Sequence, residues 1–257
     1  MSDPRLTPDP EQVVLNEAAV VQVTVADLNR QPNGPRDRQL IFGEGVTVLN
    51  RADGWCYVQA AKDGYCGHVA AANLGATFEP THAVSAPSTH IYTNANFKSP
   101  DKMSLSFGSL IAVDRITARF AQTAAGYIPT EHIRPVETLA TDPAAVAAAF
   151  LGTPYLWGGN SRWGIDCSGL VQAALLACGI PCPGDSDQQQ AIGLHATGAY
   201  QRNDLLFWKG HVAMVVDDTT LIHANAGSMS TRYEGIAETI SRIIQSGDGP
   251  VSAHRRL

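Results

Sequence analysis

The feature that most constrains this chain is an internal repeat. The segment QLIFGEGVTVL at 39–49 is echoed by SLSFGSLIAVD at 104–114, and DGYCGHVAAANL at 63–74 is echoed by AAGYIPTEHIRP at 124–135. Self-similarity at a fixed period indicates a duplicated structural unit. Each copy is long enough for a small domain. The repeat therefore predicts two tandem modules, covering roughly 14–78 and 79–136.

The pattern inside each copy predicts short strands. Val46 and Val48 alternate with polar residues, and Trp55 and Tyr57 do the same after a turn-forming segment. A period of two with Gly, Asp and Asn clusters between the runs is typical of small β structures. We expect each copy to form a small, closed or nearly closed β barrel.

The composition limits the classes of binding partner and the cellular compartment that we expect for this protein. The 257 residues carry a net charge of −6 and contain five cysteines. A mildly acidic chain without a basic cluster lacks the electrostatic footprint of a protein that binds nucleic acid or an anionic membrane. Residues 1–12 have no apolar segment like that of a secretory signal, and an odd number of cysteines suits thiol chemistry better than a disulfide framework. We therefore expect a cytoplasmic protein, and the oligomeric state stays open.

The last part of the chain, 138–257, has a different composition. Asp142-Pro143 is a helix start, and the apolar spacing after Cys167 predicts a helix that Gly179 ends. Apolar runs at 204–208, 211–216 and 220–224 predict three strands separated by short turns. A helix followed by antiparallel strands is the pattern of an α+β domain.

Three residues of this region carry the chemistry. Cys167 lies at the predicted helix start, where unpaired N–H groups and the helix dipole stabilise a thiolate. His211 opens one predicted strand and His223 lies inside the next. One imidazole can activate the thiol while the other orients the first, which is the logic of a catalytic triad.

Each of these residues also has a structural interpretation. A helical cysteine is usually a small buried hydrophobe, and a histidine in a strand is usually a core or surface residue. Their ordered occurrence together, after Gly158-Gly159, favours the catalytic interpretation. A zinc site is not expected because the sequence contains no CxxC or HExxH motif, and no cofactor is predicted.

The segments PYLWGGNSRWGIDCSGLVQAAL, NDLLFWKGHVAMVV and TLIHA closely resemble the NlpC-type family of papain-like cysteine peptidases, which cut peptidoglycan stem peptides. The repeats resemble the bacterial SH3-like barrels that often precede such a domain. The resemblance implies that Cys167 is the nucleophile, His211 the general base and His223 the residue that orients it. It also makes Tyr155 an active-site tyrosine that helps to hold the oxyanion or the substrate.

This resemblance implies a multidomain architecture. The first SH3-like barrel with its N-terminal extension covers 1–78, the second barrel covers 79–137, and an α+β papain-like catalytic domain covers 138–257. His68 stands after Gly67 where such barrels commonly carry Gly-Trp, which is a departure from the pattern.

The family implies hydrolysis of the bond between γ-linked D-glutamate and a diamino acid, meso-diaminopimelate or lysine. The two-barrel subgroup implies a free N-terminal L-alanine, as in murein peptide recycling. Asp166 and Ser168 are the expected substrate contacts beside the nucleophile, and Tyr65 and Glu44 are the candidates from the first barrel. Two alternatives remain open: an exported hydrolase that acts on polymeric peptidoglycan with the barrels as wall anchors, and a non-catalytic cell-wall binding protein.

Overall fold

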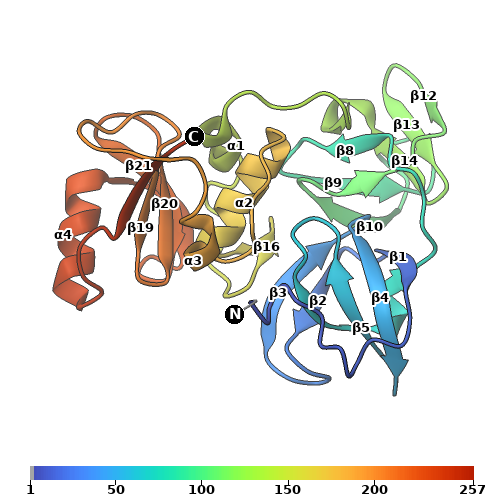
Figure 1. Ribbon diagram of the computed structural model, residues 1–257. Coiled ribbons are helices and arrows are strands. Elements are labelled where there is room, and N and C mark those ends of the chain that lie inside the picture. The colour runs from blue at the N-terminus through green and yellow to red at the C-terminus, as the bar shows by residue number, and fades with distance from the viewer. Residues whose placement is uncertain (1–2) are drawn as a thin grey trace. The chain divides into compact units, whose positions relative to one another are not determined.

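The computed structural model describes residues 3–257, so the first two residues of the predicted first domain lie outside the described residues. The chain divides into two compact units, one extending to Thr138 and the other spanning Leu139–Leu257 (Figure 1). Neither unit, within the described residues, contains a helix with the length and apolar character needed to cross a membrane.

The first part of the N-terminal unit is a seven-stranded antiparallel sheet in the order β3-β2-β6-β5-β4-β1-β7. Its strands are β1 (Glu17–Val21), β2 (Val25–Asn29), β3 (Arg36–Ile41), β4 (Gly45–Ala52), β5 (Trp55–Ala60), β6 (Cys66–Ala70) and β7 (Leu74–Gly75), with a 3₁₀ turn, η1 (Ala71–Asn73), before the last. Its apolar core contains Val21, Leu28, Val48, Val58 and Val69, all at most 1% exposed. This core confirms that the first repeat folds around its own β structure.

The core face of β5 is not the one that carries its aromatic residues. Val46 and Val48 face the core, and their partners across the ladder are Ala60 and Val58. Tyr57 therefore lies on the opposite face, where its hydroxyl accepts a hydrogen bond from the backbone N–H of Asp9 at 3.0 Å. The N-terminal extension thus covers the aromatic face of β5.

The second part of this unit repeats this succession with two short strands, β11 and β12, in the place of β4. It comprises β8 (His82–Val84), β9 (Ser88–Tyr92), β10 (Asp101–Ser106), β11 (Leu110–Ile111), β12 (Arg115–Ile116), β13 (Phe120–Thr123), β14 (Gly126–Pro129), η2 (Thr130–His132) and β15 (Ile133–Pro135). These strands form sheets in the orders β10-β9-β14-β13-β12 and β11-β8-β15 around Val84, Ile91, Leu105, Ile111 and Ile128.

The two parts of the N-terminal unit pack through the repeated Phe-Gly turn. The N–H of Leu110 donates to the carbonyl of Phe42 at 3.0 Å. A Cβ added to Gly43, whose φ is +83°, would lie 2.1 Å from the Leu110 carbonyl oxygen. This backbone approach requires glycine, so the repeated Gly43 is used for contact as well as for its turn.

The C-terminal unit is built on a six-stranded sheet in the order β18-β23-β19-β20-β21-β22. Its elements are α1 (Pro143–Ala148), β16 (Asn160–Ser161), β17 (Gly164–Ile165), α2 (Cys167–Ala177), α3 (Ser186–Gln189), β18 (Leu194–His195), β19 (Leu205–Trp208), β20 (His211–Val215), β21 (Thr220–Asn225), β22 (Ser230–Gly235), α4 (Ile236–Ser246) and β23 (Ala253–Arg256). Helix α4 covers one side of the sheet, and α1 and α2 lie on the other (Figure 1). The three strands predicted from the apolar runs are confirmed as β19, β20 and β21.

Candidate active site

The start of α2 is held by a single carboxylate. Asp166 is the N-cap residue, and its Oδ1 accepts from the Gly169 N–H at 2.6 Å and the Ser168 hydroxyl at 3.0 Å. Its Oδ2 accepts from the Gly158 N–H at 2.9 Å. One buried side chain therefore caps the helix and ties the preceding glycine loop to it, which fixes Cys167 as the first helical residue.

A close backbone approach explains the glycine two residues after the cysteine. A Cβ added to Gly169 would lie 2.5 Å from the Gly159 carbonyl oxygen and 2.7 Å from Asn160 Oδ1. The loop before the helix can therefore pack against the first turn of α2 only because Gly169 has no side chain. This packing explains why glycine follows Cys167 by two residues in the segment GIDCSG.

The Cys167 thiol lies beside the start of β20. Its Sγ is 4.0 Å from the Gly210 carbonyl oxygen, and it receives a hydrogen bond from the backbone N–H of Val212. These two contacts are on either side of His211 in the sequence. The α2 start and the β20 start thus bring the predicted nucleophile next to the predicted base.

Burial outweighs the helix start in setting the state of this thiol. The side chain is 7% exposed, and burial, followed by the Asp166 carboxylate, raises the pKa of Cys167 to about 12. Backbone N–H groups of Val212, Ser168 and Cys167 oppose that shift without overcoming it. The N–H groups at the helix start therefore favour the thiolate as expected, but burial has the larger effect on the pKa of Cys167.

The two histidines form a hydrogen-bonded chain that continues to a carboxylate. His211 Nε2 is 2.9 Å from His223 Nδ1, and His223 Nε2 is 2.8 Å from Glu234 Oε2. Burial is the main cause that lowers the pKa of both imidazoles, to about 3 for His211. The hydrogen bond from His223 lowers the pKa of Glu234 to about 2. The resting site therefore contains a neutral thiol, two neutral imidazoles and an ionised carboxylate.

Tyr155 lies at the same site. Burial raises the pKa of its phenol, and the neighbouring Cys167 and Asp166 raise it further. Tyr155 thus keeps its proton and can donate a hydrogen bond beside the thiol. It also lines, with His211, Trp208 and Arg242, a cavity of about 210 Å³. This cavity gives the C-terminal unit an opening next to the histidines.

The other residues predicted to bind the substrate make contacts within the protein. Ser168 donates to Asp166, as described above. In the N-terminal unit, the Tyr65 ring is 4% exposed in the barrel core, and Glu44 forms an ion pair with Lys62 at 2.7 Å. Their roles in substrate binding stay predictions.

Sequence analysis missed Glu234, Arg242 and Asn225. Arg242 Nη2 donates to Glu234 Oε2 at 2.6 Å, and Asn225 Nδ2 lies 2.8 Å from His223 Nε2. Asn225 is two residues after His223 on β21, so the spacing alone could have predicted that both side chains share a face of the sheet. No sequence motif marks an amide at that position. Glu234 and Arg242 come from β22 and α4, whose pairing with β21 no local pattern indicates.

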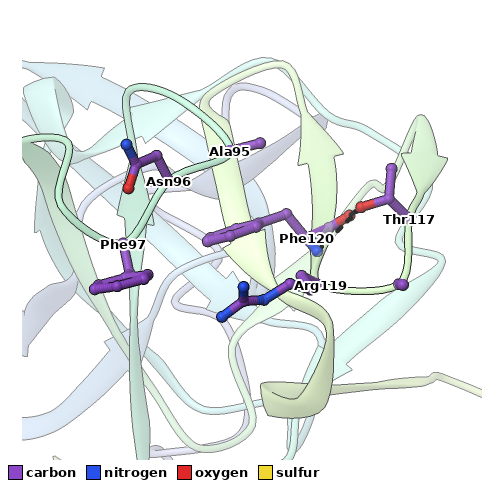
Figure 2. A pocket seen from close by; sticks show the side chains of 7 residues that line it. Ala95, Asn96, Phe97, Thr117, Arg119 and Phe120 are labelled. Atoms are coloured by element: carbon purple, nitrogen blue, oxygen red, sulfur yellow. Dashed lines mark hydrogen bonds between the residues drawn. The ribbon is translucent and has the colours of Figure 1, made fainter.

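Other places in the molecule offer less chemistry. Within residues 3–257, no three His, Cys, Asp or Glu side chains are arranged to hold a metal ion. A second cavity, of about 440 Å³, lies in the N-terminal unit, where Asn96, Phe97, Arg119 and Phe120 line it (Figure 2). It contains no nucleophilic or titratable pair.

A thiol at a helix start, beside a histidine that a second histidine orients, is the arrangement of a cysteine peptidase. Comparison with known proteins agrees. Residues 152–243 match the NlpC/P60 family, and residues 28–74 match the bacterial dipeptidyl-peptidase Sh3 domain. The chain thus contains an NlpC/P60 cysteine peptidase domain and a bacterial SH3 domain, and the resemblance stated from the sequence is confirmed for the catalytic domain and for the first repeat.

The relatives extend over most of the chain. Dipeptidyl-peptidase 6 of Lysinibacillus sphaericus is 24% identical over 86% of this chain and 92% of the relative. The gamma-D-glutamyl-L-lysine dipeptidyl-peptidase of Bacillus subtilis is 28% identical over 79% of this chain and 76% of the relative. The crystal structure of an NlpC/P60 family protein from Bacillus cereus has a TM-score of 0.80 at 21% identity, covering 93% and 99% of the two chains, and so shares the fold.

Proposed function

We propose that this peptidase hydrolyses the bond between γ-linked D-glutamate and a diamino acid in peptidoglycan stem peptides that carry a free N-terminal L-alanine. The observation that supports the reaction is the placement of the Cys167 thiol against both backbone neighbours of His211, which is itself bonded to His223. The names of the two relatives, both dipeptidyl-peptidases and one a gamma-D-glutamyl-L-lysine dipeptidyl-peptidase, support the substrate.

The reaction follows from the protonation states of the site. Because the thiol and the imidazole are both neutral at rest, His211 Nδ1 takes the Cys167 proton as sulfur attacks the carbonyl carbon. Collapse of the tetrahedral intermediate breaks the C–N bond, and His211 returns that proton to the leaving amine. Water, deprotonated by the same imidazole, then attacks the thioester carbonyl carbon, and the C–S bond breaks as the proton returns to the Cys167 sulfur. Tyr155 and the N–H groups at the start of α2 are the donors proposed to stabilise the oxyanion.

The N-terminal unit has a role in this proposal. The strands from β8 to β15 follow the succession from β1 to β7 with β4 divided into two, so we infer that the second copy is also an SH3-like barrel. We propose that the N-terminal unit supplies the wall that selects a free amine, with Tyr65 and Glu44 as its candidate contacts. We further propose that the enzyme acts on soluble peptides in the cytoplasm, which fractionation of cells would test.

The direct test uses L-Ala-γ-D-Glu-diamino acid tripeptides with either diamino acid, analysed by mass spectrometry. We expect release of the dipeptide L-Ala-D-Glu and of the free diamino acid by the full chain, and no release by Cys167→Ala. Cleavage at another bond would contradict the proposed reaction. Cleavage of polymeric peptidoglycan, with no preference for free peptides, would favour the exported cell-wall hydrolase instead.

A further inference from the structure

Glu234 is the last residue of the hydrogen-bonded chain that runs from His211 through His223. Its Oε2 accepts from His223 Nε2 at 2.8 Å, from Arg242 Nη2 at 2.6 Å and from the Thr239 hydroxyl at 3.2 Å. The side chain is 20% exposed, and Thr239 is fully buried. Three donors therefore fix one carboxylate oxygen against the inner histidine.

The strand register puts Glu234 in this position. Glu234 pairs with Leu221 across β21 and β22, and His223 pairs with Arg232. Residues that face each other across an antiparallel ladder, and residues two apart on one strand, share a face of the sheet. Glu234 and His223 are thus diagonal neighbours on one face, and α4 supplies Thr239 and Arg242 above them.

The carboxylate determines which nitrogen of each histidine carries the proton. An ionised carboxylate only accepts hydrogen bonds, so His223 Nε2 must hold a proton and His223 Nδ1 must be bare. The bare Nδ1 accepts from His211 Nε2, which must then be protonated. A neutral imidazole with a proton on Nε2 has a lone pair on Nδ1, which is the form a general base needs.

Asn225 offers the opposite arrangement. Its Oδ1 accepts from the Ser228 N–H at 2.8 Å, so its Nδ2 is the group directed at His223 Nε2. If that amide set the tautomer, His223 would hold its proton on Nδ1 and donate it to His211 Nε2. His211 would then be protonated on Nδ1 and could not take a proton from Cys167. The site therefore has two competing proton arrangements, and the charge on Glu234 favours the competent one.

We propose that Glu234 is a positioning residue that sets the tautomers of His223 and His211, so that His211 presents a bare Nδ1 to the Cys167 thiol. This inference rests on the proposed roles of Cys167 and His211. The charged residues around the two histidines shift the pKa of the imidazoles in opposite directions. Glu234 raises the pKa of both imidazoles, whereas Arg242 lowers the pKa of both and Arg232 lowers the pKa of His223. On the other side, the Cys167 thiol lies against the start of β20, and the Asp166 carboxylate raises the pKa of that thiol.

The test compares four variants by two measurements that need no substrate. Histidine nitrogen chemical shifts report each tautomer, and the rate of Cys167 alkylation by iodoacetamide across pH reports the base. Glu234→Leu removes the acceptor, so both histidines should change tautomer and alkylation at neutral pH should fall about 10- to 100-fold. Glu234→Gln keeps an amide oxygen in place, so the tautomers should persist while the acidic limb of the alkylation profile moves to lower pH.

The remaining two variants separate positioning from a loss of packing. Arg242→Gln leaves the carboxylate and removes a cation, so the acidic limb should move to higher pH, opposite to Glu234→Gln. Glu238→Gln, an exposed carboxylate on the same helix, should change neither measurement. Because Arg242 and Glu234 are both partly exposed, at least one of these variants should remain folded.

Unchanged tautomers in Glu234→Leu, or limbs that move in the same direction in Glu234→Gln and Arg242→Gln, would overturn the inference. Peptide hydrolysis measured in parallel separates it from the proposed function. If the wild-type enzyme cleaves no γ-D-glutamyl peptide but the tautomers switch as expected, the substrate is wrong and the positioning role stands. If it cleaves the peptide and Glu234→Leu behaves like wild type, only the positioning role is wrong.

Discussion

At the scale of single residues, the site depends on one thiol. Cys167→Ala should abolish hydrolysis and leave the thermal unfolding midpoint nearly unchanged, because alanine fits the first turn of a helix and removes only sulfur. Cys178, which lies at the other end of α2, is the matched control, and Cys178→Ala should retain activity. Rates measured on the tripeptide check both. More than trace activity in Cys167→Ala would mean that another group attacks the carbonyl.

The protonation states give a pH prediction with a definite sign. Burial lowers the pKa of His211 to about 3 and raises that of Cys167 to about 12, so the neutral pair predominates throughout the range between them. We expect kcat/KM to show a broad plateau around neutral pH and to fall on acidification as His211 becomes protonated. A profile that rises steeply through neutral pH, as for a thiol that must ionise alone, would contradict a neutral resting pair.

The same residues show what could be predicted from the sequence. Cys167, His211 and His223 stand in contiguous motifs, and the structure brings their elements together. Glu234 stands in STRYEG, where nothing local marks it, because its relation to His223 depends on the register of β21 against β22. The dominance of burial over the helix start at Cys167 could not be predicted, because the sequence shows a helix start but does not show how deeply the side chain is buried.

At the scale of elements, Asp166 joins the loop, the helix start and the thiol. Asp166→Ala should destabilise the chain by about 1–3 kcal/mol, since it removes an N-cap and leaves the Gly158 and Gly169 N–H groups without their acceptor. Asp142→Ala is the comparison variant, because Asp142 precedes α1 without a cap hydrogen bond and the ion pair that it forms with Arg202 is exposed and expected to contribute little. Thermal or denaturant unfolding would measure both. An unfolding midpoint that stays fixed in Asp166→Ala would leave only the predicted substrate role for this carboxylate.

The strands that could be predicted are those whose own residues carry a clear apolar pattern. Runs such as LLFW and HVAMVV gave β19 and β20 because buried strands are apolar throughout. The core face of β5 could not be predicted locally, because the N-terminal extension covers Tyr57 through a contact between residues 48 positions apart. Strand β23 lies between β18 and β19 although it comes last of the three in the sequence, and no periodicity in AHRR indicates that insertion.

At the scale of the whole molecule, the proposed selectivity for a free amine can be tested. The full chain should cleave the free tripeptide at least about 100-fold faster than its N-acetylated form, because acetylation removes a charge that the pocket must pair. A chain that begins at Leu139 should lose this preference if the N-terminal unit forms the wall. That boundary is preferable to one after residue 78, since Leu110 and Gly43 pack against each other across the two repeats. Circular dichroism would confirm that the shorter chain is folded, and equal rates on both peptides with the full chain would contradict the recycling proposal.

The burial of Cys167 also has a consequence for chemical damage. Peroxide and small electrophiles react with thiolates, and their rates follow the ionised fraction and the access of the sulfur. Cys167 is 7% exposed and its thiol is protonated at rest, so it offers little of either. The enzyme should therefore survive oxidative stress better than peptidases that store a ready thiolate. By the same reasoning, a small electrophile such as iodoacetamide should alkylate Cys167 only as fast as His211 can take the thiol proton.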